Sequence, residues 1–189
     1  KSYLPANVPE LLRGLKLNPS EQQKLQETLS KIEQLGKIAR IKGNRYILSK
    51  EADLIPGRIQ ITRNGRGFLM PDEPGLPEIA IPPRGTDTAM NDDRVLVRLD
   101  VIPKGKRTKT DEPLTGSVVK ILERRRKQIV GTLKRGREFL FVIPDDPRMP
   151  IDITVPPAKD VGRPAREGDK VVVELKHWES RHNAPEGVI

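Results

Sequence analysis

Hydrophobic positions follow a helical period before residue 50 and a strand period after it. Between residues 25 and 32, leucine and isoleucine recur at spacings of three and four, which predicts an amphipathic helix. Asn18 precedes this segment as a capping residue, and Gly36 follows it as a residue typical of helix ends. Asn7 with Pro9 indicates a shorter helix before it.

A β-hairpin is predicted directly after these helices. Residues 37–41 and 45–48 are rich in aliphatic and β-branched side chains, and Lys42-Gly43-Asn44 separates them as a turn. Two helices and a hairpin make up most of a winged helix-turn-helix, whose first helix is missing here. We therefore expect residues 1–50 to be a partial winged helix-turn-helix, and we expect the chain, which starts with Lys1, to be cut from a longer protein.

From residue 51 the pattern predicts short strands, and it occurs twice. Four landmarks return 73 to 76 residues later: Gly57, Pro71, Pro82 and Asp93 correspond to Gly131, Pro144, Pro156 and Asp169. Each copy offers about five strands, the number in an OB-type barrel. The predicted fold class is mainly β with a small α+β N-terminal unit, in which the partial winged helix-turn-helix precedes two five-stranded OB-type (cold-shock) barrels.

The predicted domains follow from this repeat. They are 1–50 (helical unit), 51–103 (first cold-shock/OB domain), 104–115 (basic linker), 116–178 (second cold-shock/OB domain) and 179–189 (tail). Lys and Arg number 6 against 9 acidic residues in 51–103, but 14 against 9 in 116–178. The net charge of +9 for the whole chain favours a polyanionic partner, and this charge belongs mainly to the helical unit and the second barrel.

The clearest binding motif runs from Arg63 through Gly65, Arg66 and Phe68. Cold-shock domains bind single strands through a strand of the form Lys-Gly-Phe-Gly-Phe-Ile, where glycines let bases approach and aromatic rings stack on them. Arg66 replaces the first aromatic residue, and its planar guanidinium can also stack. The next strand has Ala80 where an aromatic residue is usual.

Phe68 can be either a core residue or a stacking surface. It shares a strand face with Arg66, and an unpaired charge is seldom buried in a small barrel, so we predict that Phe68 faces outward. Phe139 and Phe141 also share one face, and they are either two core residues or a stacking pair.

The other candidate RNA-binding residues are basic, and each is either a phosphate contact or a solvated surface charge. They are Lys37, Arg40, Lys42 and Arg45 in the hairpin, Arg124, Arg125 and Arg126 in a basic run early in the second domain, and Lys134, Arg135 and Arg137 further along the same domain.

The residue inventory argues against catalysis. The chain has no cysteine, and its two histidines, His177 and His182, lie near its end. This excludes disulfides, thiolate metal sites and a Ser-His-Asp triad. The adjacent carboxylates Asp92-Asp93 and Asp145-Asp146 fall in turns, where neighbouring side chains diverge. We expect no cofactor, no small-molecule ligand and, since no apolar run approaches the ~20 residues of a bilayer span, no membrane contact.

Several stretches resemble the N-terminal region of bacterial ribonuclease R, in the ribonuclease II superfamily. They are residues 35–48, 57–69, 116–147 and the ending 184–189. The resemblance implies that the tail leads toward a nuclease domain, absent here, which binds magnesium and hydrolyses RNA from the 3′ end in the cytoplasm. It implies that the barrels capture and guide single-stranded RNA, and that the helical unit assists with structured RNA.

The sequence is also consistent with two other functional hypotheses. One is a winged-helix DNA-binding regulator with the barrels as interaction modules, for which the predicted second helix offers polar side chains: Gln22, Gln23, Lys24, Gln26 and Glu27. The other is a protein-docking domain, which predicts little salt-dependent affinity for RNA.

Overall fold

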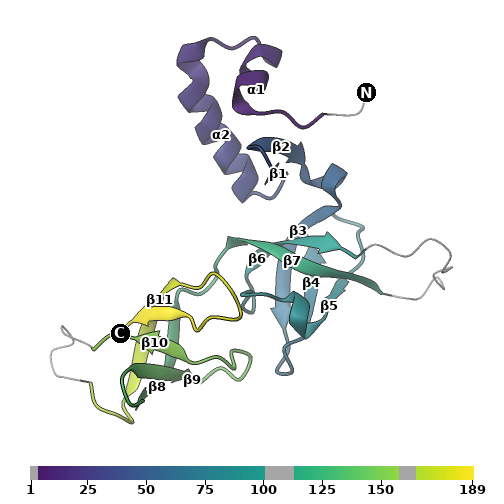
Figure 1. Cartoon of the computed structure of the whole chain (residues 1–189). Helices are drawn as coiled ribbons and strands as arrows, with labels where there is room; N and C mark the ends of the chain where they lie inside the picture. Colours follow the sequence, from purple (N-terminus) through teal and green to yellow (C-terminus); the bar gives the residue numbers. More distant parts are fainter. Residues whose placement is uncertain (1–3, 101–112, 158–164) are drawn as a thin grey trace.

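The computed structural model describes residues 4–100, 113–157 and 165–189. Three units follow one another in space as they do in sequence (Figure 1): a helical unit, a first barrel and a second barrel that contains the C-terminus. The mainly β fold class with two five-stranded barrels is confirmed.

The helical unit contains α1 (Val8–Gly14), the 3-10 turn η1 (Pro19–Glu21), α2 (Gln22–Gln34) and the hairpin of β1 (Ile38–Ile41) and β2 (Arg45–Leu48). Asn7 caps α1 as predicted, because its side chain accepts a hydrogen bond from the Glu10 amide at 2.9 Å. Asn18 precedes a 3-10 turn, after which α2 begins. The predicted helices and hairpin are confirmed, and their assignment to a winged helix-turn-helix stays a prediction.

Each barrel is closed. The first has the order β3-β4-β5-β7-β6 and consists of β3 (Leu54–Ile61), β4 (Gly67–Pro71), β5 (Ile79–Ile81), β6 (Arg94–Leu99) and β7 (Leu114–Glu123), with 3-10 turns η2 (Ser49–Ala52) and η3 (Pro83–Gly85). The second has the order β10-β12-β11-β8-β9 and consists of β8 (Gln128–Arg135), β9 (Leu140–Pro144), β10 (Ile153–Val155), β11 (Lys170–His177) and β12 (Glu186–Val188).

The domain boundaries differ from those predicted. Strand β7 pairs in parallel with β5 and antiparallel with β6, so it closes the first barrel, which ends at Glu123 and not at residue 103. Strand β12, within the predicted tail, closes the second barrel by the same parallel pairing with β10. The repeat landmarks cover only the first four strands of each barrel, and the fifth follows a long connection. Of the predicted linker 104–115, residues 104–112 lie outside the described ranges.

The repeat is visible in the closest backbone approaches. A Cβ on Gly57 would lie closer than 3.0 Å to the carbonyl oxygen of Met70, and a Cβ on Gly131 would meet that of Ile143 in the same way. Glycine is therefore required where the first two strands of each barrel cross closely.

The helical unit covers the outer face of the first barrel on the side of β6 and β7. Arg94 donates hydrogen bonds to the last carbonyl groups of the α2 region, including that of Leu35 at 2.8 Å, and Lys120 pairs with Glu33 at 2.9 Å. Leu96 is buried there beside the hairpin.

The equivalent face of the second barrel is open. Val172 pairs with Val130 as Leu96 pairs with Pro56, yet Val172 and Val130 are 49% and 51% exposed. The two barrels therefore share a strand arrangement, but this face is covered by the helical unit in the first barrel and exposed to solvent in the second.

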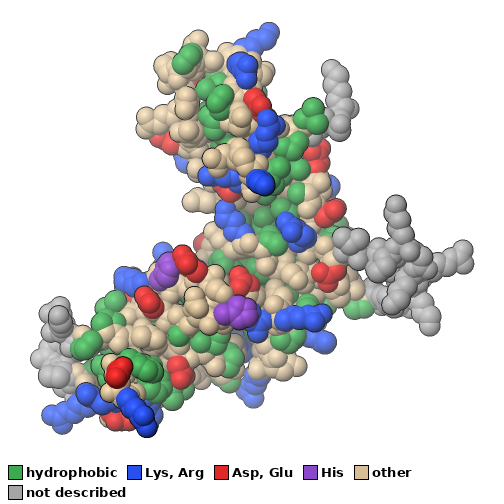
Figure 2. All heavy atoms as spheres, viewed as in Figure 1, with side chains coloured by type: hydrophobic (Ala, Val, Ile, Leu, Met, Phe, Trp, Pro, Cys, Tyr) green, Lys and Arg blue, Asp and Glu red, His purple; other side chains and the backbone are tan. Residues whose placement is uncertain are grey.

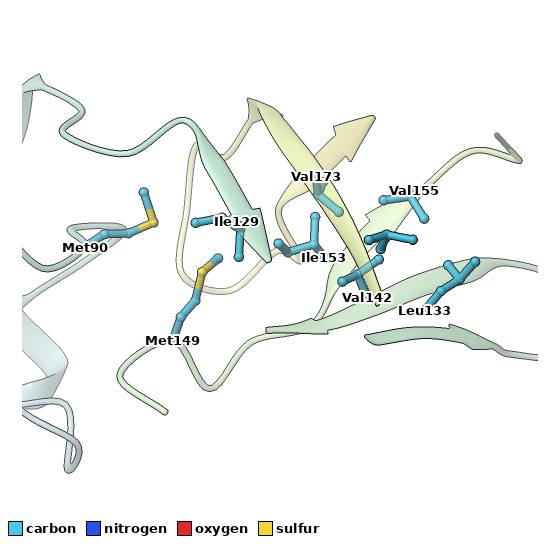
Figure 3. Packing of buried hydrophobic residues seen from close by; sticks show 9 residues of the cluster. Met90, Ile129, Leu133, Val142, Met149, Ile153, Val155 and Val173 are labelled. Atoms are coloured by element: carbon cyan, nitrogen blue, oxygen red, sulfur yellow. The ribbon is translucent and has the colours of Figure 1, made fainter. Parts of the chain in front are cut away.

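The two barrels are joined by apolar packing. Met90 extends from the first barrel toward Met149 and Ile129 of the second, and belongs to the second barrel's core (Figure 3). Arg181 of the second barrel donates to the carbonyl oxygen of Pro83 at 2.8 Å.

A buried ion pair lies at the same seam. Asp93 is completely buried and accepts a hydrogen bond from the Arg124 guanidinium at 2.7 Å and from the Arg125 backbone amide at 3.0 Å. Arg124 also donates to the carbonyl oxygen of Thr88 at 2.5 Å, and its guanidinium lies 5.5 Å from the centre of the Trp178 ring. Arg124 thus connects both barrels through its single side chain.

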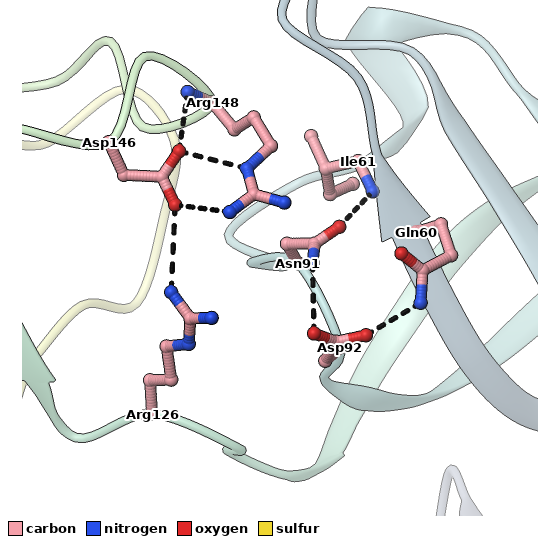
Figure 4. Close-up of polar contacts among 7 residues, drawn as sticks. All are labelled: Gln60, Ile61, Asn91, Asp92, Arg126, Asp146 and Arg148. Atoms are coloured by element: carbon pink, nitrogen blue, oxygen red, sulfur yellow. Dashed lines mark hydrogen bonds and ion pairs between the residues drawn. The ribbon is translucent and has the colours of Figure 1, made fainter.

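A second cluster of charges faces the first barrel across the seam (Figure 4). Arg148 contacts Asp146 through two nitrogens, at 2.8 and 2.7 Å, and Arg126 approaches the same carboxylate at 3.7 Å. Hydrogen bonding from Arg148 holds the pKa of Asp146 below its ordinary value. The pair therefore stabilises the fold fully above that ordinary value, and its contribution is lost as the pH falls through the lowered pKa.

We expect Gly131→Ala to lower the free energy of unfolding by about 1–3 kcal/mol, because the added methyl group forces the backbone of β9 to move. Urea unfolding followed by circular dichroism measures this change. Gly14→Ala is the matched control, since nothing lies within 4 Å of the methyl group it adds. Equal stability of the two variants would contradict the close approach.

We expect Arg124→Ala to lower the free energy of unfolding by about 3 kcal/mol, because it leaves the charge of Asp93 buried without its partner. The neighbouring Arg125→Ala should change it by less than ~0.5 kcal/mol, since this side chain is exposed and the amide that bonds Asp93 is retained. Urea unfolding of both variants makes the comparison, and similar stabilities would show that the Asp93 pair does not hold the seam.

Candidate nucleic-acid interface

The outer face of β3, β4 and β5 carries the first candidate site. Phe68 lies between two buried residues of β4, Gly67 and Leu69, so its ring points away from the barrel core. It is half-buried and lies in register with Gln60 on β3 and Ala80 on β5. The outward orientation predicted for Phe68 is confirmed, and its contact with RNA stays a prediction.

The loop between β3 and β4 brings two arginines to the edge of this face. Thr62 and Arg66 are joined by a backbone hydrogen bond of 2.9 Å, and Gly65 takes a positive φ of 77°, which closes the loop tightly. Arg63 and Arg66 are exposed and have no ion-pair partner within the described ranges. Their charges are therefore available beside Phe68.

The second barrel carries an outward aromatic pair. The ring centres of Phe139 and Phe141 are 5.8 Å apart, and the ring planes are inclined by 49°. Phe139 is 56% exposed and Phe141 is half-buried, while Val142, next to Phe141, is fully buried in the core. The structure thus decides between the two alternatives left open for this pair: the rings are surface residues.

Basic side chains surround the aromatic pair. Phe141 lies in register with Lys134 on β8 and with Thr154 on β10. A groove of about 740 Å³ beside it is lined by Phe139 together with the exposed Arg135 and Arg137. On the face shown in Figure 2, Lys and Arg side chains gather around a hydrophobic patch at the end of the second barrel farthest from the first.

Two of the predicted hairpin contacts already have protein partners. Arg45 donates to Glu10 and to the carbonyl oxygen of Pro5, both at 2.6 Å, and thereby holds the start of the chain against β2. Arg40 pairs with Glu33 at 3.2 Å and lies 5.3 Å from the centre of the Tyr46 ring.

Lys37 and Lys42 are exposed and remain the basic side chains of the hairpin without an ion-pair partner among residues whose structure is described. These two lysines are the hairpin residues best placed to meet a phosphate.

The basic residues 124–126 also differ in whether they already contact other protein groups. Arg124, predicted to contact RNA, is bound to Asp93 and Thr88 at the seam, so its charge is not available to a phosphate. With Lys127, residues 124–126 form a run of four basic side chains, which in sequence is typical of a solvated loop. The sequence does not show that the distant Asp93 binds one of them. Arg125 is exposed, and Arg126 approaches Asp146.

Sequence reasoning missed the seam residues Trp178, Arg148 and Arg181. Trp178 is the single tryptophan of the chain, and this was the signal in the sequence that could have marked it as a candidate functional residue. Among the described residues, no group of three or more His, Cys, Asp or Glu is arranged to hold a metal ion, and no helix is long and apolar enough to cross a membrane.

Comparison with known families agrees with the two barrels. Residues 57–113 match the ribonuclease B OB domain, and residues 141–189 match the cold shock domain. Among solved structures, Mycoplasma genitalium RNase R in complex with ribose methylated single-stranded RNA has a TM-score of 0.57 at 16% identity, covering 71% of this chain and 20% of that chain. Yeast Ssd1, a pseudonuclease, has a TM-score of 0.55 at 18% identity, covering 74% and 22%. These likenesses concern the fold.

Curated relatives match along nearly the whole chain. Ribonuclease R of Thermotoga maritima is 34% identical over 99% of this chain and 25% of its own length, and that of Escherichia coli is 31% identical over 100% and 22%. The chain thus spans about a quarter of the length of these relatives. With the two matched domains in the same chain, these relatives confirm its resemblance to the ribonuclease R family.

Proposed function

We propose that this chain captures single-stranded RNA on the outer faces of its two barrels and guides it toward the remainder of a ribonuclease R-like protein. One observation carries the proposal: Phe68 and Phe141 occupy equivalent outward positions on the second strand of each barrel. Both rings are half-buried on the outer face of a strand, so each keeps part of its apolar surface accessible for a base to stack on.

Stacking explains why the partner would be single-stranded. A base can lie on Phe68 or Phe141 only when it is not already stacked within a duplex, and each such contact is worth about 1–3 kcal/mol. OB-type barrels bind oligonucleotides on the face of their second and third strands and on the adjoining loops. The outward rings lie on that face in both barrels.

Basic side chains would hold the phosphates beside the stacked bases. Arg63 and Arg66 flank the first face, and Lys134, Arg135 and Arg137 flank the second. These charges would also make the affinity fall as salt rises, since phosphate contacts release counterions.

The proposed role belongs to a larger protein. The relatives are named ribonuclease R, and one solved structure of similar fold holds single-stranded RNA. We place 3′-to-5′ hydrolysis and the magnesium that supports it outside this chain, and we place the protein in the cytoplasm with its RNA. The helical unit, through Lys37 and Lys42, would add contacts to structured RNA.

We expect the chain to bind single-stranded RNA more tightly than duplex DNA of equal length, because the outward rings need unstacked bases. Fluorescence anisotropy with matched labelled probes measures both affinities. Tighter binding of the duplex would favour the DNA-binding regulator, and salt-independent or undetectable binding of both probes would favour a protein-docking domain.

We expect Phe68→Ala to weaken RNA binding by about 1–3 kcal/mol, because it removes a stacking surface. It should lower stability by far less than the ~3–5 kcal/mol typical of a buried phenylalanine. Anisotropy and thermal unfolding on the same variant test both statements, with Phe68→Trp as the control that keeps an aromatic surface. A large loss of stability with RNA affinity intact would make Phe68 a structural residue.

A further inference from the structure

A cavity of about 320 Å³ lies at the seam between the two barrels. Its first wall is the loop that contains Arg63 and Gly65, and its opposite wall includes Met149, Trp178 and Arg181. Cavities that bind small ligands begin at about 300 Å³, so this one is large enough for a small planar group.

Trp178 gives the cavity an aromatic wall. The ring is half-buried, and its Nε1–H donates to the carbonyl oxygen of Ser180 at 3.1 Å, which fixes its orientation. The Arg124 guanidinium lies 5.5 Å from the ring centre. A tryptophan held in this way and still lining a cavity is suited to stack on a base.

The charge of the cavity favours an anion. Three arginines line it, and of these Arg148 is already paired with Asp146. Arg181 donates to the neutral carbonyl oxygen of Pro83, and Arg63 is exposed. Neither guanidinium is paired with a carboxylate in the described part of the chain, so both charges are available to an anion. Asp87 is the acidic residue among the lining side chains.

The cavity is lined by the loop that leads to the face that carries Phe68. Arg63 belongs to the loop that leads into β4, and Gly65 of the same loop also lines the cavity. A strand of RNA that stacks on Phe68 and follows this loop would therefore arrive at the seam.

We propose that the seam cavity is a nucleotide subsite, in which Trp178 receives a base of the bound RNA and Arg63 and Arg181 contact its phosphates. This inference rests on the proposed function and adds a site that involves both barrels. It also assigns the seam a role besides packing: the subsite exists only while the two barrels keep their relative position.

Intrinsic fluorescence tests this directly, because Trp178 is the single tryptophan. The probe is a 12-nucleotide single-stranded oligoadenylate with a fluorescent label for anisotropy, and the same unlabelled strand for tryptophan fluorescence. We expect quenching of Trp178 that saturates at the concentration where anisotropy saturates.

Variants separate stacking from packing. Trp178→Leu should weaken binding by about 5-fold or more, which corresponds to the lower end of base stacking. Arg63→Ala and Arg181→Ala should each reduce the slope of log affinity against log salt by about 0.7. Arg13→Ala, on α1 and away from both barrels, is the control and should leave the slope unchanged. Thermal unfolding verifies that each variant is folded, and the fluorescence of Trp178 gives the decisive result if Arg181→Ala is not, because Arg63 also lies beside Phe68.

The outcomes distinguish the two proposals. Tight binding by anisotropy without quenching of Trp178, and with an unchanged salt slope in Arg181→Ala, would overturn the seam subsite and leave the proposed function standing. Absence of binding in the anisotropy measurement itself would overturn both.

Discussion

Asp93 is completely buried where the two barrels meet, and its charge is offset by Arg124, which follows the last strand of the first barrel. The Asp93 carboxylate also accepts a hydrogen bond from the Met90 amide at 2.9 Å, and the Asp93 carbonyl oxygen accepts one from the Ile59 amide. It therefore connects the hydrogen bonding of the first barrel, the loop that carries Met90 into the second core, and the start of the second barrel. A buried charge tolerates few other arrangements, because losing its partner is costly.

The repeat explains both the similarity and the difference of the two barrels. Asp169 occupies the position of Asp93 and accepts from the Arg166 amide at 2.9 Å, as Asp93 accepts from that of Met90. The backbone needs this contact in both copies. The outer faces of the barrels do not take part in this shared contact and can differ. The helical unit covers Leu96 in the first barrel, while the equivalent Val172 is exposed in the second.

Local signals in the sequence predicted the local structure. The Asn7 cap, the hairpin around Gly43 and the repeated glycines at 57 and 131 each reflect constraints within a few residues or between adjacent strands. The outward position of Phe68 was predicted from Arg66, because a charged side chain indicates which face of a strand is exposed to solvent.

Contacts distant in sequence could not be predicted. Strand β7 follows a long connection and pairs in parallel with β5, so its membership of the first barrel depends on tertiary structure. Arg124 lies in an ordinary basic run, and nothing in that run indicates a partner 31 residues earlier. The cavity residues come from both barrels for the same reason, and only the relative placement of the barrels brings Arg63 and Trp178 to one cavity.

We expect the Asp93 seam to hold the two barrels as one unit, so that the outer faces that carry Phe68 and Phe141 keep a fixed relation. The chain has no cysteine, so Glu78→Cys and Asp152→Cys, one exposed position in each barrel, allow specific spin labelling. Pulsed electron–electron double resonance then measures the distance distribution between the labels. We expect one narrow distance distribution that single-stranded RNA leaves unchanged and that Arg124→Ala broadens. A broad distribution with Arg124 present would show that the seam does not hold the two barrels in one arrangement.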